Sequence, residues 1–260
     1  MADRNSTSAP EIAPARNLIA VASGKGGVGK TWFAITLSHA IARAGRRALL
    51  FDGDLGLANV DIQLGLMPER DLAAVIAGRI GLKQSVTHYP EGGFDIIAGR
   101  SGTGNLASLP LQRLTQLRNA LVALAQSYDR VVLDLGAGVD RTVKTMAGGA
   151  GLSLVITNDE PTSITDAYAF LKLTYAERPD ADLRIVVNMA ESKAAGERTY
   201  ETLRNACRNF LKREPALGGI VRADRRVRET IRHQTPLLAR HPNTGAAEDV
   251  EAIAQRLLGD

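Results

Sequence analysis

The stretch that decides the fold is Ser23-Gly24-Lys25-Gly26-Gly27-Val28-Gly29-Lys30-Thr31. It follows an apolar run at residues 18–22 and precedes a helix-like run from about Lys30 to Ala44. The pattern GxxxxGK(S/T) therefore stands between a strand and a helix, where such loops bind phosphates. The alternative is a plain glycine-rich turn, but the complete motif in this context favours nucleotide binding.

Each residue type in this loop has a physical task in holding a nucleotide. Glycines let backbone N–H groups turn toward phosphate oxygens, and the helix that follows adds the positive end of its dipole. Lys30 supplies a cation for the outer phosphates, and Thr31 supplies a hydroxyl for Mg²⁺. We therefore predict ATP or ADP with Mg²⁺, held by Gly24, Lys25, Gly26, Gly27, Val28, Gly29, Lys30, Thr31 and Trp32.

The composition fits a single α/β domain. The 260 residues are 45% apolar but only 4% aromatic, as in aliphatic helices packed on a parallel sheet. The single cysteine, Cys207, excludes a disulfide framework and a cysteine-ligated iron–sulfur carrier, and the four histidines lack metal-binding spacing. We expect residues 1–16, which are rich in Ser, Ala and Pro, to be a disordered tail, and residues 17–260 to form the domain.

Charge is distributed unevenly along the chain. The net charge is only +4, yet the segment from Arg198 to Arg240 holds eleven Lys or Arg against four acidic residues. This excess suits either a surface for anionic lipid, nucleic acid or an acidic partner, or an ordinary solvated helical face. We find neither a secretory signal nor an apolar run long enough to span a membrane, and we expect a cytoplasmic protein.

Acidic residues follow two apolar strand-like runs. Residues 48–51 lead into Asp52-Gly53-Asp54, and residues 130–133 lead into Asp134. The carboxyl ends of parallel strands face the ligand crevice, so Asp52 is predicted to lie toward the phosphates and the metal. The segment at residues 130–134 resembles a Walker B strand, and this resemblance implies that Asp134 joins Thr31 and Asp52 at the metal. Asp54 would lie further out on its loop. The alternative for Asp52 and Asp54 is a turn-forming Asp/Gly cluster.

Strand and helix patterns alternate along the rest of the chain. They predict a doubly wound, mostly parallel sheet of seven or eight strands, with helices on both faces. We expect residues 62–93 to be less regular, with a short helix at residues 71–76 that Asp71 could cap, and residues 101–108 to be a mobile loop. A helix beginning at residues 160–168 would be capped by Thr162 or Ser163, and a helix from Glu197 to Lys212 would bury Phe210.

The octapeptide GKGGVGKT at residues 24–31 resembles the deviant Walker A loop of the MinD/ParA ATPases. Lys25 has no evident task within one chain, because Lys30 already neutralises the phosphates. The resemblance implies that Lys25 crosses to the nucleotide of a second copy in an ATP-bound homodimer. The segment DGDLGLANVD at residues 52–61 is similar to switch I of this superfamily. It implies that Asp54 orients the attacking water, Asp52 assists the Mg²⁺ shell and Asn59 belongs to the switch.

Later segments resemble the FlhG/FleN (YlxH) branch, which regulates the number and placement of bacterial flagella. They are DLGAG at 134–138, EPTSITDAY at 160–168, VVNMA at 186–190 and the region 222–236. This resemblance places Asn188, Arg222 and Asp224 beside the adenine. It implies a slow, partner-stimulated ATPase. The implied partners are the GTPase FlhF, flagellar switch or C-ring proteins, or a flagellar transcription regulator.

The chain departs from that branch in three places. Trp32 stands where a smaller residue is usual, and the first residues lack the DQAxxL-like motif that stimulates FlhF. The last helix, about Thr244 to Leu258, is acidic on its polar side, at Glu248, Asp249 and Glu251. We expect it to pack in the core, which leaves open whether the protein visits the cell pole or the inner membrane.

Two other functions remain open. The first is a ParA-type partition ATPase that positions DNA or other cargo by binding non-specific DNA, which the basic segment would allow. The second is a binding module in which the nucleotide has only a structural role.

Overall fold

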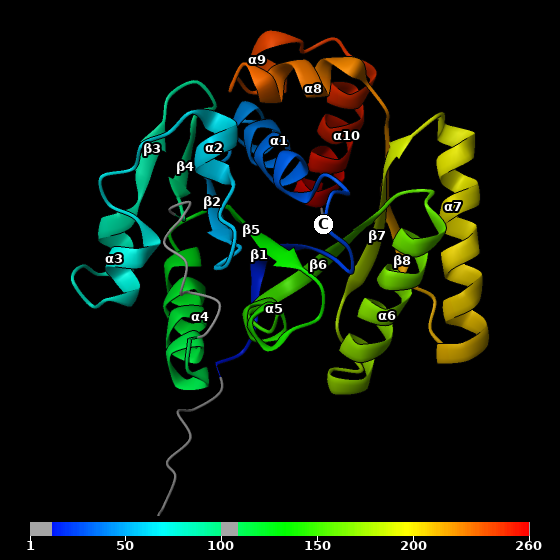
Figure 1. Ribbon diagram of the computed structural model, residues 1–260, viewed down its shortest axis with the longest axis horizontal. Coiled ribbons are helices and arrows are strands. Elements are labelled where there is room, and N and C mark those ends of the chain that lie inside the picture. The colour runs from blue at the N-terminus through cyan, green and yellow to red at the C-terminus, as the bar shows by residue number, and fades with distance from the viewer. Residues whose placement is uncertain (1–11, 100–108, 260) are drawn as a thin grey trace, which may run out of the picture.

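Eight strands form one sheet through the centre of the computed structural model, which describes residues 12–99 and 109–259 (Figure 1). The strand order is β3-β4-β2-β5-β1-β6-β7-β8, and β3 runs antiparallel to β4 while the other neighbouring pairs are parallel. The strands are β1 (Ala15–Ser23), β2 (Ala48–Gly53), β3 (Thr87–Tyr89), β4 (Phe94–Ile97), β5 (Arg130–Ala137), β6 (Ala150–Thr157), β7 (Leu183–Ala190) and β8 (Ala216–Arg222). This confirms the predicted fold class.

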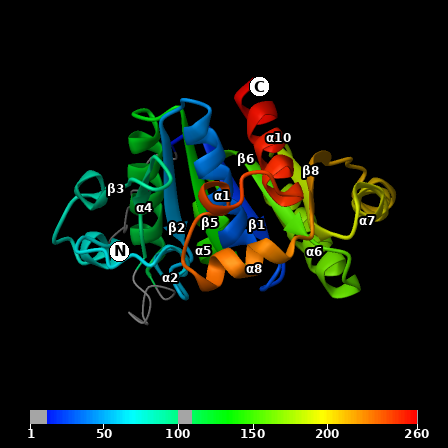
Figure 2. The ribbon, with the colours of Figure 1, turned by 90° about the horizontal axis from the view of Figure 1, so that it is seen from above.

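Helices cover both faces of the sheet, as Figures 1 and 2 show. One face carries α1 (Lys30–Arg43), α2 (Val60–Leu64), α8 (Arg225–Arg232), α9 (Leu237–Arg240) and α10 (Gly245–Gly259). The other carries α4 (Leu111–Ala125), α5 (Arg141–Ala147), α6 (Pro161–Glu177) and α7 (Lys193–Ala206), and α7 continues into the π-helical turn η3 (Cys207–Leu211). Beside the β3–β4 edge lie α3 (Leu72–Ile76) and the 3₁₀ turn η1 (Leu82–Ser85).

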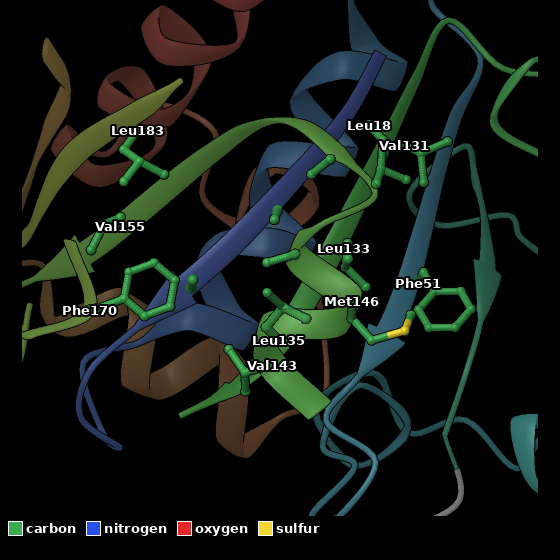
Figure 3. Close-up of a cluster of buried hydrophobic side chains, with 14 of the residues drawn as sticks. Leu18, Phe51, Val131, Leu133, Leu135, Val143, Met146, Val155, Phe170 and Leu183 are labelled. Carbon is green, nitrogen blue, oxygen red and sulfur yellow. The ribbon is translucent and has the colours of Figure 1, made fainter. Parts of the chain in front are cut away.

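Continuous apolar runs explain why the central strands are buried. Residues 18–22 of β1 and 131–133 of β5 are at most 2% exposed, as strands covered on both faces must be. Figure 3 shows Phe51 of β2, Leu133 of β5 and Met146 of α5 in one of the two core layers. Because β1 lies between β5 and β6 in the interior of the sheet, the loop that follows β1 lies at the carboxyl ends of the central strands.

The C-terminal helix is part of the core, as predicted. Ala246, Val250 and Ile253 of α10 are at most 1% exposed, and the helix packs against α1 and β8. One detail of the prediction is wrong: Asp249 does not face solvent but is 4% exposed, because it bonds to residues of β8 and α7. No helix in the described part of the chain is both long enough and apolar enough to cross a membrane.

Several local predictions differ from the structure. β1 begins at Ala15, inside the segment expected to be a tail, and β3 and η1 occupy part of the region expected to be less regular. The short helix predicted at residues 71–76 is confirmed: α3 follows Asp71, whose side chain accepts a hydrogen bond from the backbone N–H of Ala74. The cap of α6 is Glu160 and not Thr162 or Ser163, because Pro161 takes the first helical position. Residues 1–11 and the predicted loop at 101–108 lie outside the described residues.

Phe210 does not lie in the core, contrary to the prediction from helical spacing. It is 77% exposed, while Leu203 and Cys207 on the same predicted stripe are fully buried. The π-helical hydrogen bonding of η3 widens the turn, so residue 210 rotates off the stripe that a regular helix would continue.

The burial of α10 gives a stability prediction. Ile253→Ala should lower the free energy of unfolding by about 2–5 kcal/mol, because it opens a cavity between α10 and β8. Ile62→Ala is the matched control, since Ile62 is 53% exposed, and it should change stability by less than about 1 kcal/mol. Denaturant unfolding measures both, and equal losses would contradict the core position of α10.

Candidate active site

The glycine-rich loop joins β1 to α1 and is shaped by close backbone contacts. Gly29, which precedes α1, has a φ of +86°, and a Cβ there would lie 2.5 Å from Nδ2 of Asn188. A Cβ at Gly24 would lie 2.1 Å from the backbone oxygen of Asp166 in α6. Asn188 also donates a 2.8 Å hydrogen bond to the Val28 carbonyl. The loop therefore tolerates only glycine at these two points, and Asn188 braces it from β7.

Lys30 and two carboxylates meet where the loop enters α1. Asp52, near the C-terminal end of β2, and Asp134, in the second half of β5, are register partners, and each is 1% exposed. Burial, helped by the charge of Asp134, raises the pKa of Asp52 to about 8. Burial also raises the pKa of Asp134 to about 7, against the opposing effects of Thr31 and Lys30. Two buried carboxylates this close favour a bound cation.

The electrostatics of Lys30 reflect the same cluster. Its side chain is buried, and this burial lowers its pKa, while the neighbouring charges of Asp134 and Asp54 act in the opposite direction. Lys30 thus stays within the field of these two acids and beneath the loop. Its ammonium group can therefore pair with a phosphate in surroundings that are largely closed to water.

The donor set fits a magnesium ion. Oδ1 of Asp134 is buried and has no hydrogen-bond partner among the described residues, and the Thr31 hydroxyl bonds to the same carboxylate. Hydroxyl and carboxylate oxygens are the ligands that Mg²⁺ prefers. No group of three or more His, Cys, Asp or Glu in the described part of the chain could hold a metal alone. Nucleotide phosphates would therefore supply further oxygens, as is usual for Mg²⁺.

Asp54 lies on the outer loop, as predicted, and its carboxylate is held by that loop. Its Oδ1 accepts hydrogen bonds from the backbone N–H of Leu57 at 2.9 Å and of Gly56 at 3.3 Å. A Cβ at Gly136, near the C-terminal end of β5, would lie 3.3 Å from the same oxygen. Asn59 follows, with its amide bonded to the Leu57 carbonyl. The segment predicted as switch I thus approaches the C-terminal end of β5 through Asp54.

Lys25 has a partner within its own chain, contrary to the expectation. Its Nζ lies 2.5 Å from Oε2 of Glu160 and 2.9 Å from the hydroxyl of Thr162, at the start of α6. The pKa of Glu160 is lowered by this hydrogen bond and by the charge of Lys25. The side chains are 36% and 55% exposed, so the pair lies at the mouth of the site and is open to solvent.

The residues predicted for the base border one cavity of about 330 Å³ beside the loop. Asn188, Trp32, Arg222 and Asp224 all line this cavity. Arg222 ends β8, and Asp224 caps α8. Met189 also lines the cavity and has a φ of +57°, which is uncommon for a residue with a side chain. The cavity is continuous with the loop at Gly29.

The guanidinium of Arg222 faces α10. Its Nε and Nη2 donate to the two carboxylate oxygens of Asp249, each at 2.9 Å, and its backbone N–H donates to Oδ2. Lys193, the first residue of α7, forms a second ion pair with Asp249 at 2.7 Å. Asp249 therefore fastens the end of β8, and with it the wall of the cavity, to two helices.

Comparison with known proteins identifies the family. The model of the CobQ/CobB/MinD/ParA nucleotide binding domain matches residues 19–237. The chain belongs to this family. It is 37% identical over 240 residues to the antiactivator FleN of Pseudomonas aeruginosa, covering 92% of this chain and 85% of FleN. It is 28% identical over 242 residues to the flagellum site-determining protein YlxH of Helicobacter pylori, covering 92% and 81%.

A solved structure shows the same fold. The septum site-determining protein MinD of Pyrococcus horikoshii, complexed with Mg-ADP, superposes with a TM-score of 0.78 at 21% identity, covering 93% of this chain and 96% of that one. The predicted MinD/ParA superfamily is confirmed, and with it the prediction of an ATPase that uses ATP or ADP with Mg²⁺.

Three residues with evident roles in this site were not singled out from the sequence. Glu160 stands three residues after the end of the buried strand β6, so an acidic residue close behind an apolar run, as at Asp52 and Asp134, is the signal that could have found it. Asp249 falls on the apolar stripe of its helix, three residues after Ala246 and four before Ile253, so helical spacing reveals it. The left-handed backbone of Met189 has no sequence signal.

The fastening of the cavity wall gives a second prediction. Asp249→Asn should lower the free energy of unfolding by about 1–3 kcal/mol, since it weakens hydrogen bonds to two cations. It should also weaken ADP binding, measured by calorimetry, because the wall loses its anchor. Glu251→Gln is the control: its pair with Arg43 is partly exposed, so stability should fall by about 1 kcal/mol or less, with unchanged ADP binding. Equal effects of the two variants would contradict the anchoring role.

Proposed function

We propose that this chain is an ATP-driven molecular switch that dimerises with ATP and controls the number or placement of the bacterial flagellum. The likeness to FleN and YlxH over nine-tenths of the chain supports the flagellar role. The observation that carries the switch mechanism is the position of Lys25, which lies at the solvent-open mouth of the site and pairs with Glu160. A solvent-exposed ion pair contributes little stability, so the Lys25 side chain can leave Glu160 and pair with a stronger anion, such as the phosphates bound to a second copy.

Within one copy, the residues divide the work of hydrolysis. Lys30 and the backbone of the loop hold the phosphates, while Thr31, Asp52 and Asp134 hold Mg²⁺. When bound, Mg²⁺ neutralises phosphate charge that grows during transfer. Asp54 orients the attacking water once the outer loop moves and releases its carboxylate from Gly56 and Leu57. This order of events makes turnover slow until a second copy and a partner rearrange the loops.

The proposed partners follow the flagellar role. They are a flagellar transcription regulator, switch or C-ring proteins, and the GTPase FlhF. We place the protein in the cytoplasm, with recruitment to the pole or the inner membrane through such a partner. The apolar face of α10 is buried in the core, so this face is already covered and does not meet lipid.

A ParA-type function is the second candidate, supported by the exposed arginines 225, 228 and 232 of α8. Other cations of the basic segment are used internally, since Arg222 pairs with Asp249, and Arg226 and Arg240 pair with Glu229. Binding to non-specific DNA that requires ATP and weakens steeply with salt would favour this function over the flagellar one.

The crossing of Lys25 predicts a variant that cannot dimerise. Lys25→Ala should abolish ATP-dependent dimerisation in light scattering while it retains ATP binding, because Lys30 still holds the phosphates. The matched control is Lys144→Ala, which removes an equally short lysine–glutamate pair, with Glu177, remote from the loop. A Lys25→Ala protein that dimerises like the wild type would sink the crossing-lysine mechanism.

The role of Asp54 predicts a trapped state. Asp54→Ala should lower ATP turnover by about a hundredfold or more while the ATP-bound dimer persists. Pull-down with this variant plus ATP should therefore enrich a flagellar partner, identified by mass spectrometry, relative to the same variant with ADP. Normal turnover of the variant would remove Asp54 from the mechanism, and enrichment of DNA-segregation components alone would contradict the flagellar role.

A further inference from the structure

Trp32 occupies the junction between the phosphate loop and the neighbouring cavity. It is the third residue of α1, counting from Lys30, so its backbone belongs to the turn whose N–H groups face the phosphates. Its side chain extends away from that turn and lines the 330 Å³ cavity together with Asn188 and Met189. Trp32 thus connects the place where phosphates bind with the place where the rest of a nucleotide must lie.

The indole is an unusual occupant of this position, because its polar atom has no partner. The side chain is 6% exposed, and Nε1 is buried without a hydrogen-bond acceptor among the described residues. Buried tryptophan N–H groups usually find a partner, and an unpaired donor costs about 1–3 kcal/mol. The apolar part of the ring packs in the core with Val28 and Phe33, which fixes the residue at this point.

The cavity beside Trp32 suits a flat heteroaromatic group. Met189 and Val227 give it apolar walls, whereas Asn188 and Asp224 give it a few polar atoms. Pockets for small molecules combine these features, and polarisable sulfur packs well against aromatic rings. The left-handed backbone of Met189 points to a site whose geometry is held under strain.

We propose that Trp32 is a specificity-determining residue that packs against the nucleoside part of the nucleotide and donates its indole N–H to an oxygen of the ribose. This inference rests on the proposed ATP-binding function and deepens it. A small tilt of the ring toward the cavity supplies the missing acceptor for Nε1. Binding then depends on the nucleoside as well as on the phosphates that the loop holds.

The test exploits the fact that Trp32 is the only tryptophan of the chain. Titration of the wild type with Mg-ADP should change the tryptophan emission, with the same Kd that calorimetry reports. Magnesium pyrophosphate, which has no nucleoside, should bind and leave the emission nearly unchanged. Trp32→Phe keeps a six-membered aromatic ring while it removes the N–H donor and part of the ring volume. It should weaken ADP binding about tenfold by calorimetry, the equivalent of one lost hydrogen bond.

Pyrophosphate binding separates this role from a merely structural one. Trp32→Phe should bind pyrophosphate as tightly as the wild type and keep its melting temperature within a few degrees. Equal ADP affinity of the two proteins, or an equal loss for ADP and pyrophosphate, would overturn the inference while the proposed ATPase function stands. A wild type that binds pyrophosphate but shows no emission change with saturating ADP would overturn it too. Absence of ADP binding by the wild type would overturn both.

Discussion

Two carboxylates buried side by side are the constraint on which the rest of this site depends. Asp52 and Asp134 are register partners on neighbouring strands, and burial raises the pKa of each well above its ordinary value. Asp134 faces Lys30 and the Thr31 hydroxyl, and Asp52 accepts hydrogen bonds from the backbone N–H groups of Asp54 and Val60. A cation with phosphates can complete the site. The sheet order that puts β5 between β1 and β2 makes this juxtaposition, so the fold and the chemistry have a common origin.

The same arrangement explains why the protein is suited to switching. The phosphate loop is braced by buried contacts to Asn188 and α6, whereas Lys25 and Asp54 are held by hydrogen bonds at the surface. Rigid parts therefore bind the nucleotide, and weakly held parts can move when a second copy or a partner approaches. Glu160 connects a weakly held part to a rigid one. It holds Lys25 by a hydrogen bond, and it caps α6, a helix that packs in the core.

The sequence predicted most of the site because the chemistry is local. The loop, Asp52 and Asp134 were recognisable since each follows an apolar strand, and parallel strands bring their carboxyl ends together. Contacts between distant segments were not predictable in this way. Lys25 and Glu160 are 135 positions apart, and the sequence around Lys25 does not indicate its partner. The widened turn that exposes Phe210 depends on hydrogen bonding that residue spacing does not encode. Asp249 is different, because its spacing from Ala246 and Ile253 puts it on the buried side of the helix, and this could be read from the sequence.

The central claim is that one copy holds the nucleotide and two copies complete the active site. The most direct measurement is the ATPase rate per molecule over a wide range of protein concentration, at saturating Mg-ATP. If Lys25 of each copy serves the other, the rate per molecule should rise from near zero with concentration and then level off as dimers fill. A rate per molecule that stays constant over the whole range would show that one copy hydrolyses ATP alone, and would contradict the account.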